Sequence, residues 1–128
     1  MSEFSSPSVS EVVSSSLHNL SDFENLYHET SKEDEGALAD IYGRFLEDLR
    51  DNEYDFSLLL EGKDKFESKI DCRVIKEILD LIKVLEVPSS KDRQSKVLSV
   101  QSDSFWDSIY EFRVRLEDLQ SEALKREI

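Results

Sequence analysis

The chain has 128 residues, of which 35% are charged, and its formal net charge is −13 at pH 7. A chain this acidic repels phosphate backbones and anionic lipids, which argues against direct binding to nucleic acid or to a membrane. A single cysteine excludes an internal disulfide, and three glycines with two prolines leave too few turn signals for many short strands.

The negative charge is concentrated in the N-terminal half. Residues 1–60 contain 14 acids and 3 bases, whereas residues 61–100 contain 8 acids and 9 bases. No apolar run at the N-terminus resembles a signal peptide, and none reaches the roughly 18 residues of a membrane-spanning helix. We therefore expect an intracellular, cytoplasmic protein, with a nuclear location left open, in which residues 8–128 form a single helical domain.

The first helix is predicted over residues 8–27. Residues 1–7 are polar and end at Pro7, and we expect them to form a disordered, flexible, serine-rich tail. Ser8, with Glu11 three residues later, is a capping-box pattern. Apolar residues then recur at helical spacing at Val9, Val12, Val13, Leu17, Leu20, Phe23 and Tyr27. Serine is a mediocre helix former, so the helix depends on tertiary packing, and a disordered serine-rich segment is the alternative.

A second helix is predicted over residues 37–61, after a polar linker at 28–36. Its apolar side alternates steps of four and three residues, which is a heptad rhythm, at Leu38, Tyr42, Phe45, Leu49, Asn52, Phe56 and Leu59. Asn52 interrupts this seam with a polar side chain. It either fixes register or oligomeric state, or marks where the helix bends or ends. Gly62 is the predicted stop.

Alternating acids between Asp51 and Gly62 suggest a calcium loop. An EF-hand requires glycine at its sixth position and glutamate at its twelfth. Phe56 and Gly62 occupy those positions here, and Phe56 with Leu59 continues the apolar rhythm of the helix. The stretch is therefore predicted to be helical, with its acids facing solvent.

Two further helices are predicted over residues 67–87 and 104–126. The first of these is apolar over more than half of its circumference, as in central helices of a bundle, and Pro88 ends it. Residues 88–102 mix basic and apolar side chains and fit either a short helix or an irregular crossover. The last helix carries a heptad seam at Phe105, Ile109, Phe112, Leu116, Leu119 and Ala123.

Residues able to bind a metal or to carry catalysis are scattered. His18 with Asp22, and Glu24 with His28, offer two ligands each, whereas zinc sites use three or four. Cys72 lies in a partly apolar stretch, where a free cysteine is usually a small buried side chain rather than a nucleophile. We therefore predict no catalytic residue, no cofactor and no metal, and a protein that is not an enzyme.

Trp106, Tyr110 and Val114 form a second stripe beside the seam of the last helix. Two aromatic side chains at helical spacing usually widen a buried face, so burial in the core is the simpler interpretation. Trp and Tyr are also enriched in binding hot spots, and the neighbouring seam already supplies a core face. These three residues are therefore the candidates for a partner-binding patch.

These patterns predict an all-α fold, either a four-helix bundle or two packed helical hairpins with heptad-like seams. The leading functional hypothesis is a non-enzymatic protein–protein interaction module. It would be a small adaptor or a subunit of a larger assembly, and its partner another protein or a second copy. An acidic inhibitor or immunity-type protein is the alternative, because an acidic surface is steered onto a basic target site. A small acidic secretion or assembly chaperone also fits the size and charge.

Overall fold

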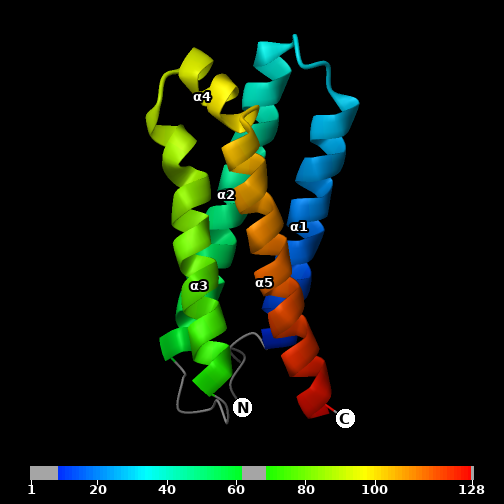
Figure 1. The fold of residues 1–128 in the computed structure, drawn as a ribbon, viewed down its shortest axis with the longest axis vertical. Coiled ribbons are helices and arrows are strands. Elements are labelled where there is room, and N and C mark those ends of the chain that lie inside the picture. The colour runs from blue at the N-terminus through cyan, green and yellow to red at the C-terminus, as the bar shows by residue number, and fades with distance from the viewer. Residues whose placement is uncertain (1–8, 62–68, 128) are drawn as a thin grey trace, which may run out of the picture.

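Four long helices run along the molecule and a short one crosses one end (Figure 1). The computed structural model describes residues 9–61 and 69–127, and no strand occurs among them. The elements are α1 (Val9–Glu29), α2 (Glu35–Glu61), α3 (Lys69–Glu86), the 3₁₀ helix η2 (Val87–Ser90), α4 (Arg93–Val100) and α5 (Asp103–Glu127). The predicted all-α helical bundle is confirmed. The predicted tail at 1–7, the Ser8 cap and the Gly62 stop lie outside the described residues.

The long helices are arranged as an up-down bundle. α1 packs against α2 and α5, and α3 packs against the same two helices. Each long helix therefore contacts its neighbours in the chain, and α5 closes the ring against α1. α4 lies at the end where α1 joins α2, packs against α2, and carries the chain from α3 to α5 (Figure 1). Of the two predicted arrangements, this is the four-helix bundle.

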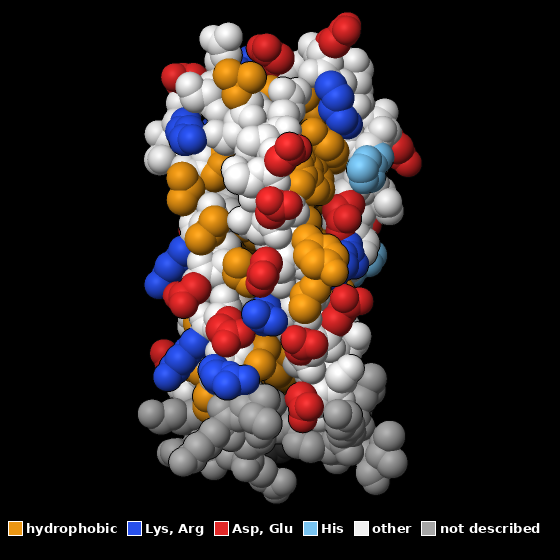
Figure 2. Space-filling model, viewed as in Figure 1, with side chains coloured by type: hydrophobic (Ala, Val, Ile, Leu, Met, Phe, Trp, Pro, Cys, Tyr) orange, Lys and Arg blue, Asp and Glu red, His pale blue; other side chains and the backbone are white. Residues whose placement is uncertain are grey.

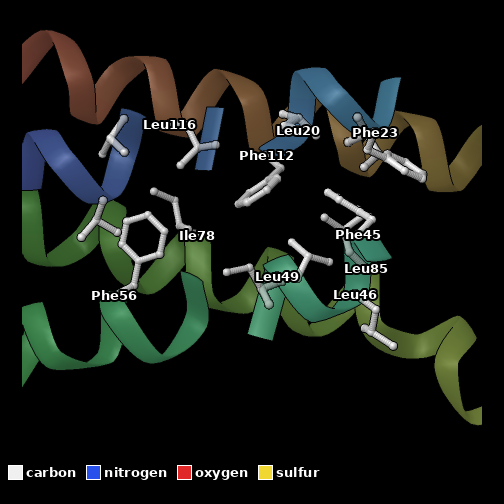
Figure 3. Packing of buried hydrophobic residues seen from close by; sticks show 14 of the residues in the cluster. Leu20, Phe23, Phe45, Leu46, Leu49, Phe56, Ile78, Leu85, Phe112 and Leu116 are labelled. Carbon is white, nitrogen blue, oxygen red and sulfur yellow. The ribbon is translucent and has the colours of Figure 1, made fainter. Parts of the chain in front are cut away.

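The core follows the axis of the bundle and contains the predicted seams (Figure 3). The seam of α2 is buried from Leu38 to Leu59, and that of α5 is buried from Phe105 to Leu119. Each large apolar side chain contributes about 1.5–3 kcal/mol when fully buried. Over these described side chains both seams are closed within one chain, and the side chain of Ala123 lies outside them. A spare seam is therefore no longer a reason to expect a partner.

The linker between α1 and α2 is shorter than the predicted 28–36. α1 continues to Glu29, and the Thr30 hydroxyl donates a hydrogen bond to the Leu26 carbonyl (2.6 Å). α2 begins at Glu35, because the Asp34 carboxylate accepts a bond from the Ala37 amide (3.1 Å). Polar side chains thus satisfy backbone groups that the helix ends leave free, and each helix gains two residues over the prediction.

Residues 88–102, for which the sequence left two alternatives open, form η2 and α4. Pro88 prevents α3 from continuing, and the chain tightens into the 3₁₀ turn. Asp92 then caps α4 by accepting a bond from the Ser95 amide (2.8 Å). An aspartate at this spacing before a helix is a start signal that the sequence does carry. Gln101 at the end of α4 donates to the Lys32 carbonyl (3.0 Å), which ties α4 to the loop between α1 and α2.

The acidic stretch that begins at Asp51 is the last part of α2, as predicted. Phe56 and Leu59 point into the core. Within the described residues, no cluster of three or more His, Cys, Asp or Glu side chains is placed to hold a metal ion. No helix in the described part of the chain combines the length and apolarity that crossing a bilayer requires.

Candidate functional site

Trp106 lies in an aromatic cluster between α5 and α1. Its ring stacks on Phe23, with centroids 5.6 Å apart and planes at 8°, and its centroid is 4.5 Å from that of Tyr27. The indole Nε1 donates a hydrogen bond of 2.9 Å to the Val100 carbonyl at the end of α4. A tryptophan with its nitrogen bonded and its ring stacked on core residues holds helices together, whatever further contact its exposed edge makes.

The structure separates the other two members of the predicted stripe from Trp106. Tyr110 is 68% exposed, and Val114 is half-buried. Trp106 therefore contributes to the packing between helices, whereas the side chain of Tyr110 is mostly exposed to solvent. A partner-binding role for the three residues stays a prediction.

The candidate metal pairs do not gather further ligands. His18 lies 3.3 Å from Asp22 on the exposed face of α1. Glu24 forms an ion pair with Arg113 of α5 instead of meeting His28. Cys72 is half-buried on α3. Both candidate pairs lie on α1, and within the described residues neither has the third ligand that a zinc site needs.

An apolar groove lies beside α4, at the end of the bundle where α1 joins α2. We call it the α4 groove, and it has a volume of about 510 Å³. Its walls come from the end of α3, η2, α4 and the first turns of α5. The groove therefore cannot be predicted from the pattern of any one of these segments. The lining residues are Val84, Leu85, Val87, Pro88, Lys91, Leu98, Ser99, Ser102, Ser104, Phe105 and Ser108.

Three apolar side chains of the α4 groove are unusually exposed. Val84 on α3 is 51% exposed, Val87 on η2 is 54% exposed and Leu98 on α4 is 61% exposed. In Figure 2, hydrophobic side chains are visible among polar ones over α3 and α4, and a larger group lies over the boundary between α5 and α1. A concave apolar surface that keeps several large side chains in water is typical of a binding site.

The α4 groove and the predicted stripe lie on different sides of α5. At 100° per residue, Trp106 stands about 160° around the helix from both Ser104 and Ser108. Trp106 therefore faces α1, and the two serines line the groove with residues of α3 and α4. The two surfaces are separate candidates.

The serine hydroxyls on the rim of the α4 groove are already bonded to the protein. Ser102 donates to the Ser99 carbonyl (2.6 Å), and Ser108 donates to the Ser104 carbonyl (3.2 Å). The Ser99 hydroxyl accepts a bond of 2.9 Å from the Lys91 ammonium. These bonds shape the rim and leave the ammonium as the main polar group able to take a new partner.

The backbone carbonyls at the end of α3 are also satisfied. The Tyr42 hydroxyl donates to the Leu85 carbonyl (2.8 Å), and Ser89 donates to that of Glu86 (2.6 Å). The Pro88 carbonyl accepts from the Lys91 amide (3.1 Å). Helix ends normally leave four carbonyls free, so these bonds leave the carbonyls of Leu85, Glu86 and Pro88 with partners inside the chain.

The lining of the α4 groove contains one charged residue, Lys91, and no acid. Residues 88–100 hold three bases and one acid, although the chain as a whole carries −13. That acid, Asp92, is engaged as the cap of α4, and its bonds to Ser95 lower the pKa of its carboxyl. The lining of the groove is thus apolar, with one positive charge, on a negative protein.

A second notable surface is acidic and lies on α1 and α2. Burial raises the pKa of the Asp48 carboxyl, and the negative charges of Asp51, Asp22 and Glu47 raise it further. The neighbouring His18 opposes this effect. The carboxylates are therefore close enough to repel one another, which concentrates negative potential on this face.

Comparison of the chain with protein-family models, with curated protein sequences and with solved structures gave no match. The function proposed below therefore depends on the geometry and chemistry of this chain alone.

Proposed function

We propose that this chain is a non-enzymatic protein–protein interaction module, a small helical adaptor or a subunit of a larger assembly, and that the α4 groove is its docking surface. The observation that carries the proposal is the exposure of Val84, Val87 and Leu98 around one apolar concavity. About half of each side chain is already covered, so covering the rest on binding contributes roughly half of the 1.5–3 kcal/mol of full burial, before the costs of association.

The rest of the described surface supports this choice. The other exposed large apolar residues are Leu26, Tyr54 and Tyr110, which stand on three different helices. Single exposed apolar residues are normal on a monomer, whereas a cluster in a concave place is not. The buried seams leave the groove as the best-supported contact surface of the folded chain.

Site-specific photo-crosslinking in the cells that make the protein tests the proposal. A benzoylphenylalanine in place of Leu98 or Val84 should give a discrete adduct with another protein. The same probe in place of Tyr54, which is 66% exposed on α2, is the matched control. The proposal is wrong if the groove positions give no adduct, or if the Tyr54 position gives the same adducts.

An acidic inhibitor that blocks a basic site is the second candidate function. It is favoured by the crowding of carboxylates around Asp48, since such a face accelerates association with a basic target. For this candidate, a probe in place of Asp51 rather than Leu98 should give the adduct, and salt added before irradiation should lower the yield of adduct. A complex held in the α4 groove should persist in salt, because apolar contacts are not screened.

A further inference from the structure

We infer that the α4 groove receives an amphipathic helical segment of another protein, and that a carboxylate on this segment pairs with Lys91. The inference rests on the proposed docking function and names the chemistry of the partner. Three observations carry it: the free donors of Lys91, which is the charged residue of the lining, the exposure of the groove walls and the absence of a free backbone edge among the described residues.

Lys91 is positioned to take an anion. Its ammonium has three N–H donors, and one of them is used by the Ser99 hydroxyl at 2.9 Å. Among the described residues, no carboxylate lies within ion-pair distance of it. The bond to Ser99 directs the ammonium along the rim of the groove, so a carboxylate at the edge of a docked segment can reach the remaining donors.

The charge around the groove favours an acidic partner over a basic one. Lys91 is the charged residue of the described lining. The Arg93 guanidinium lies beside Gly36 at the start of α2, and Asp92 is engaged as the helix cap. Salt at physiological strength screens charges beyond about 8 Å, so a carboxylate of the partner gains from Lys91 only where it stands next to this ammonium. The carboxylates around Asp48 lie on α1 and α2, on another face of the bundle.

A helix is the form of peptide that this surface accepts. Peptides that bind as strands need an exposed sheet edge with free N–H and C=O groups, and the described residues include no strand. The carbonyls of Leu85, Glu86 and Pro88 are already bonded. A helix satisfies its own backbone and offers apolar side chains three or four residues apart, which suits walls that are made of side chains.

The openness of the groove argues against a small amphiphile. Sites for small ligands bury most of the ligand surface, whereas Val84, Val87 and Leu98 each keep about half or more of their area in water. A second copy of the chain fits poorly as well. Each copy carries a net charge of −13, so two copies repel one another.

A displayed peptide library tests the inference. Its peptides have about 16 residues, roughly four helical turns, with apolar residues at positions i, i+3, i+4 and i+7 and random residues elsewhere. Selection uses the full chain, and labelled peptides are then titrated with Lys91→Gln, Lys91→Arg and Leu98→Gln variants. Lys76→Gln, which removes an exposed positive charge on α3 outside the groove, is the matched control.

We expect enriched peptides to carry an acid beside the apolar stripe. Lys91→Gln should weaken their binding roughly 2- to 5-fold, which is the effect of an exposed ion pair. Lys91→Arg and Lys76→Gln should leave it nearly unchanged, and Leu98→Gln should weaken it about 10-fold or more. Replacing the peptide acid by its amide should abolish the sensitivity to Lys91→Gln.

Other outcomes overturn the inference in distinguishable ways. One outcome is that enriched peptides bind the Leu98→Gln variant less well but show no preference for an acid. The docking function would then stand, and Lys91 would have no role in it. Peptides that bind the Leu98→Gln and Val84→Gln variants normally, or no enrichment at all, would remove the docking function too. Saturable binding of laurate without any peptide, or a Leu98-dependent dimer in light scattering, would assign the groove to a small amphiphile or to a second copy.

Discussion

Asn19 of α1 donates a side-chain hydrogen bond of 3.1 Å to the side-chain oxygen of Asn52 of α2. Asn52 is only 3% exposed and occupies a seam position that is otherwise apolar. α2 continues to Glu61, so Asn52 does not end the helix. A polar pair in a buried seam has few alternative partners, which makes this bond a means of fixing how α1 and α2 are aligned.

The first prediction concerns this pair. Asn52→Ala should lower the free energy of unfolding by about 1–3 kcal/mol, because it removes the bond and leaves the amide of Asn19 without its partner. In a double-mutant cycle with Asn19→Ala, chemical denaturation should give a coupling energy of about 0.5–1.5 kcal/mol. Additive effects of the two substitutions would show that the bond contributes nothing to stability.

The second prediction separates Trp106 from Tyr110. Trp106→Ala should lower the free energy of unfolding by about 2–4 kcal/mol, less than a fully buried tryptophan would, because the ring is half-buried. Tyr110→Ala, one helical turn later and 68% exposed, should change it by about 0.5 kcal/mol or less. Thermal and denaturant unfolding measure both. If both substitutions changed the free energy of unfolding equally little, Trp106 would not stabilise the fold, and its role would be limited to binding a partner.

The third prediction concerns Tyr42, whose hydroxyl is buried and bonded to the Leu85 carbonyl. Burial, reinforced by the charge of Glu86, raises the pKa of Tyr42 to about 12. The folded state holds this proton more tightly than the unfolded state, in which tyrosine titrates near 10. The stabilisation is therefore complete below pH 10 and is lost as the pH rises towards 12, by roughly 2–3 kcal/mol.

Tyr42→Phe is the control for this pH dependence. The variant should be less stable than the natural chain at neutral pH by about 1–2 kcal/mol, because the hydrogen bond is lost. Subtracting the two stabilities cancels the contribution of the lysines, which both chains share. The difference should fall between pH 10 and 12 by roughly 2–3 kcal/mol, so the natural chain should lose its advantage within this range. A difference that stays constant over this range would mean that the Tyr42 hydroxyl ionises normally in the folded protein.

The fourth prediction concerns Ser16, which is 1% exposed and whose hydroxyl has no hydrogen-bond partner among the described residues. Ser16→Ala removes this unsatisfied polar atom from the α1 interface and should raise the free energy of unfolding by about 1–2 kcal/mol. The neighbouring Ser15 is exposed, so Ser15→Ala reports only the gain in helix propensity, about 0.5 kcal/mol or less. Equal gains for the two variants would show that the Ser16 hydroxyl costs nothing.

Local patterns of the sequence determined the helices and much of their inward faces. The 3.6-residue period is a property of each segment, so the seam from Leu38 to Leu59 identified its buried side before any partner helix was known. The same reasoning dismissed the calcium loop, because Phe56 stood where a glycine was required. The ends of α1 and α2 were two residues off, since Thr30 and Asp34 add terminal bonds that periodicity does not record.

Only the tertiary structure decided which surfaces meet. Trp106 was visible as a neighbour of the core seam, but whether its ring would be covered depended on Phe23 and Tyr27 of α1, about 80 residues earlier in the chain. The α4 groove joins Val84, Val87 and Leu98 from three elements, and the apolar residues of segment 88–102 alone gave no sign of it. Periodicity fixes the direction of a side chain about its own helix, whereas a groove or an interhelical bond depends on where separate helices are placed. That placement is set by the burial summed over all of them and by the turns between them.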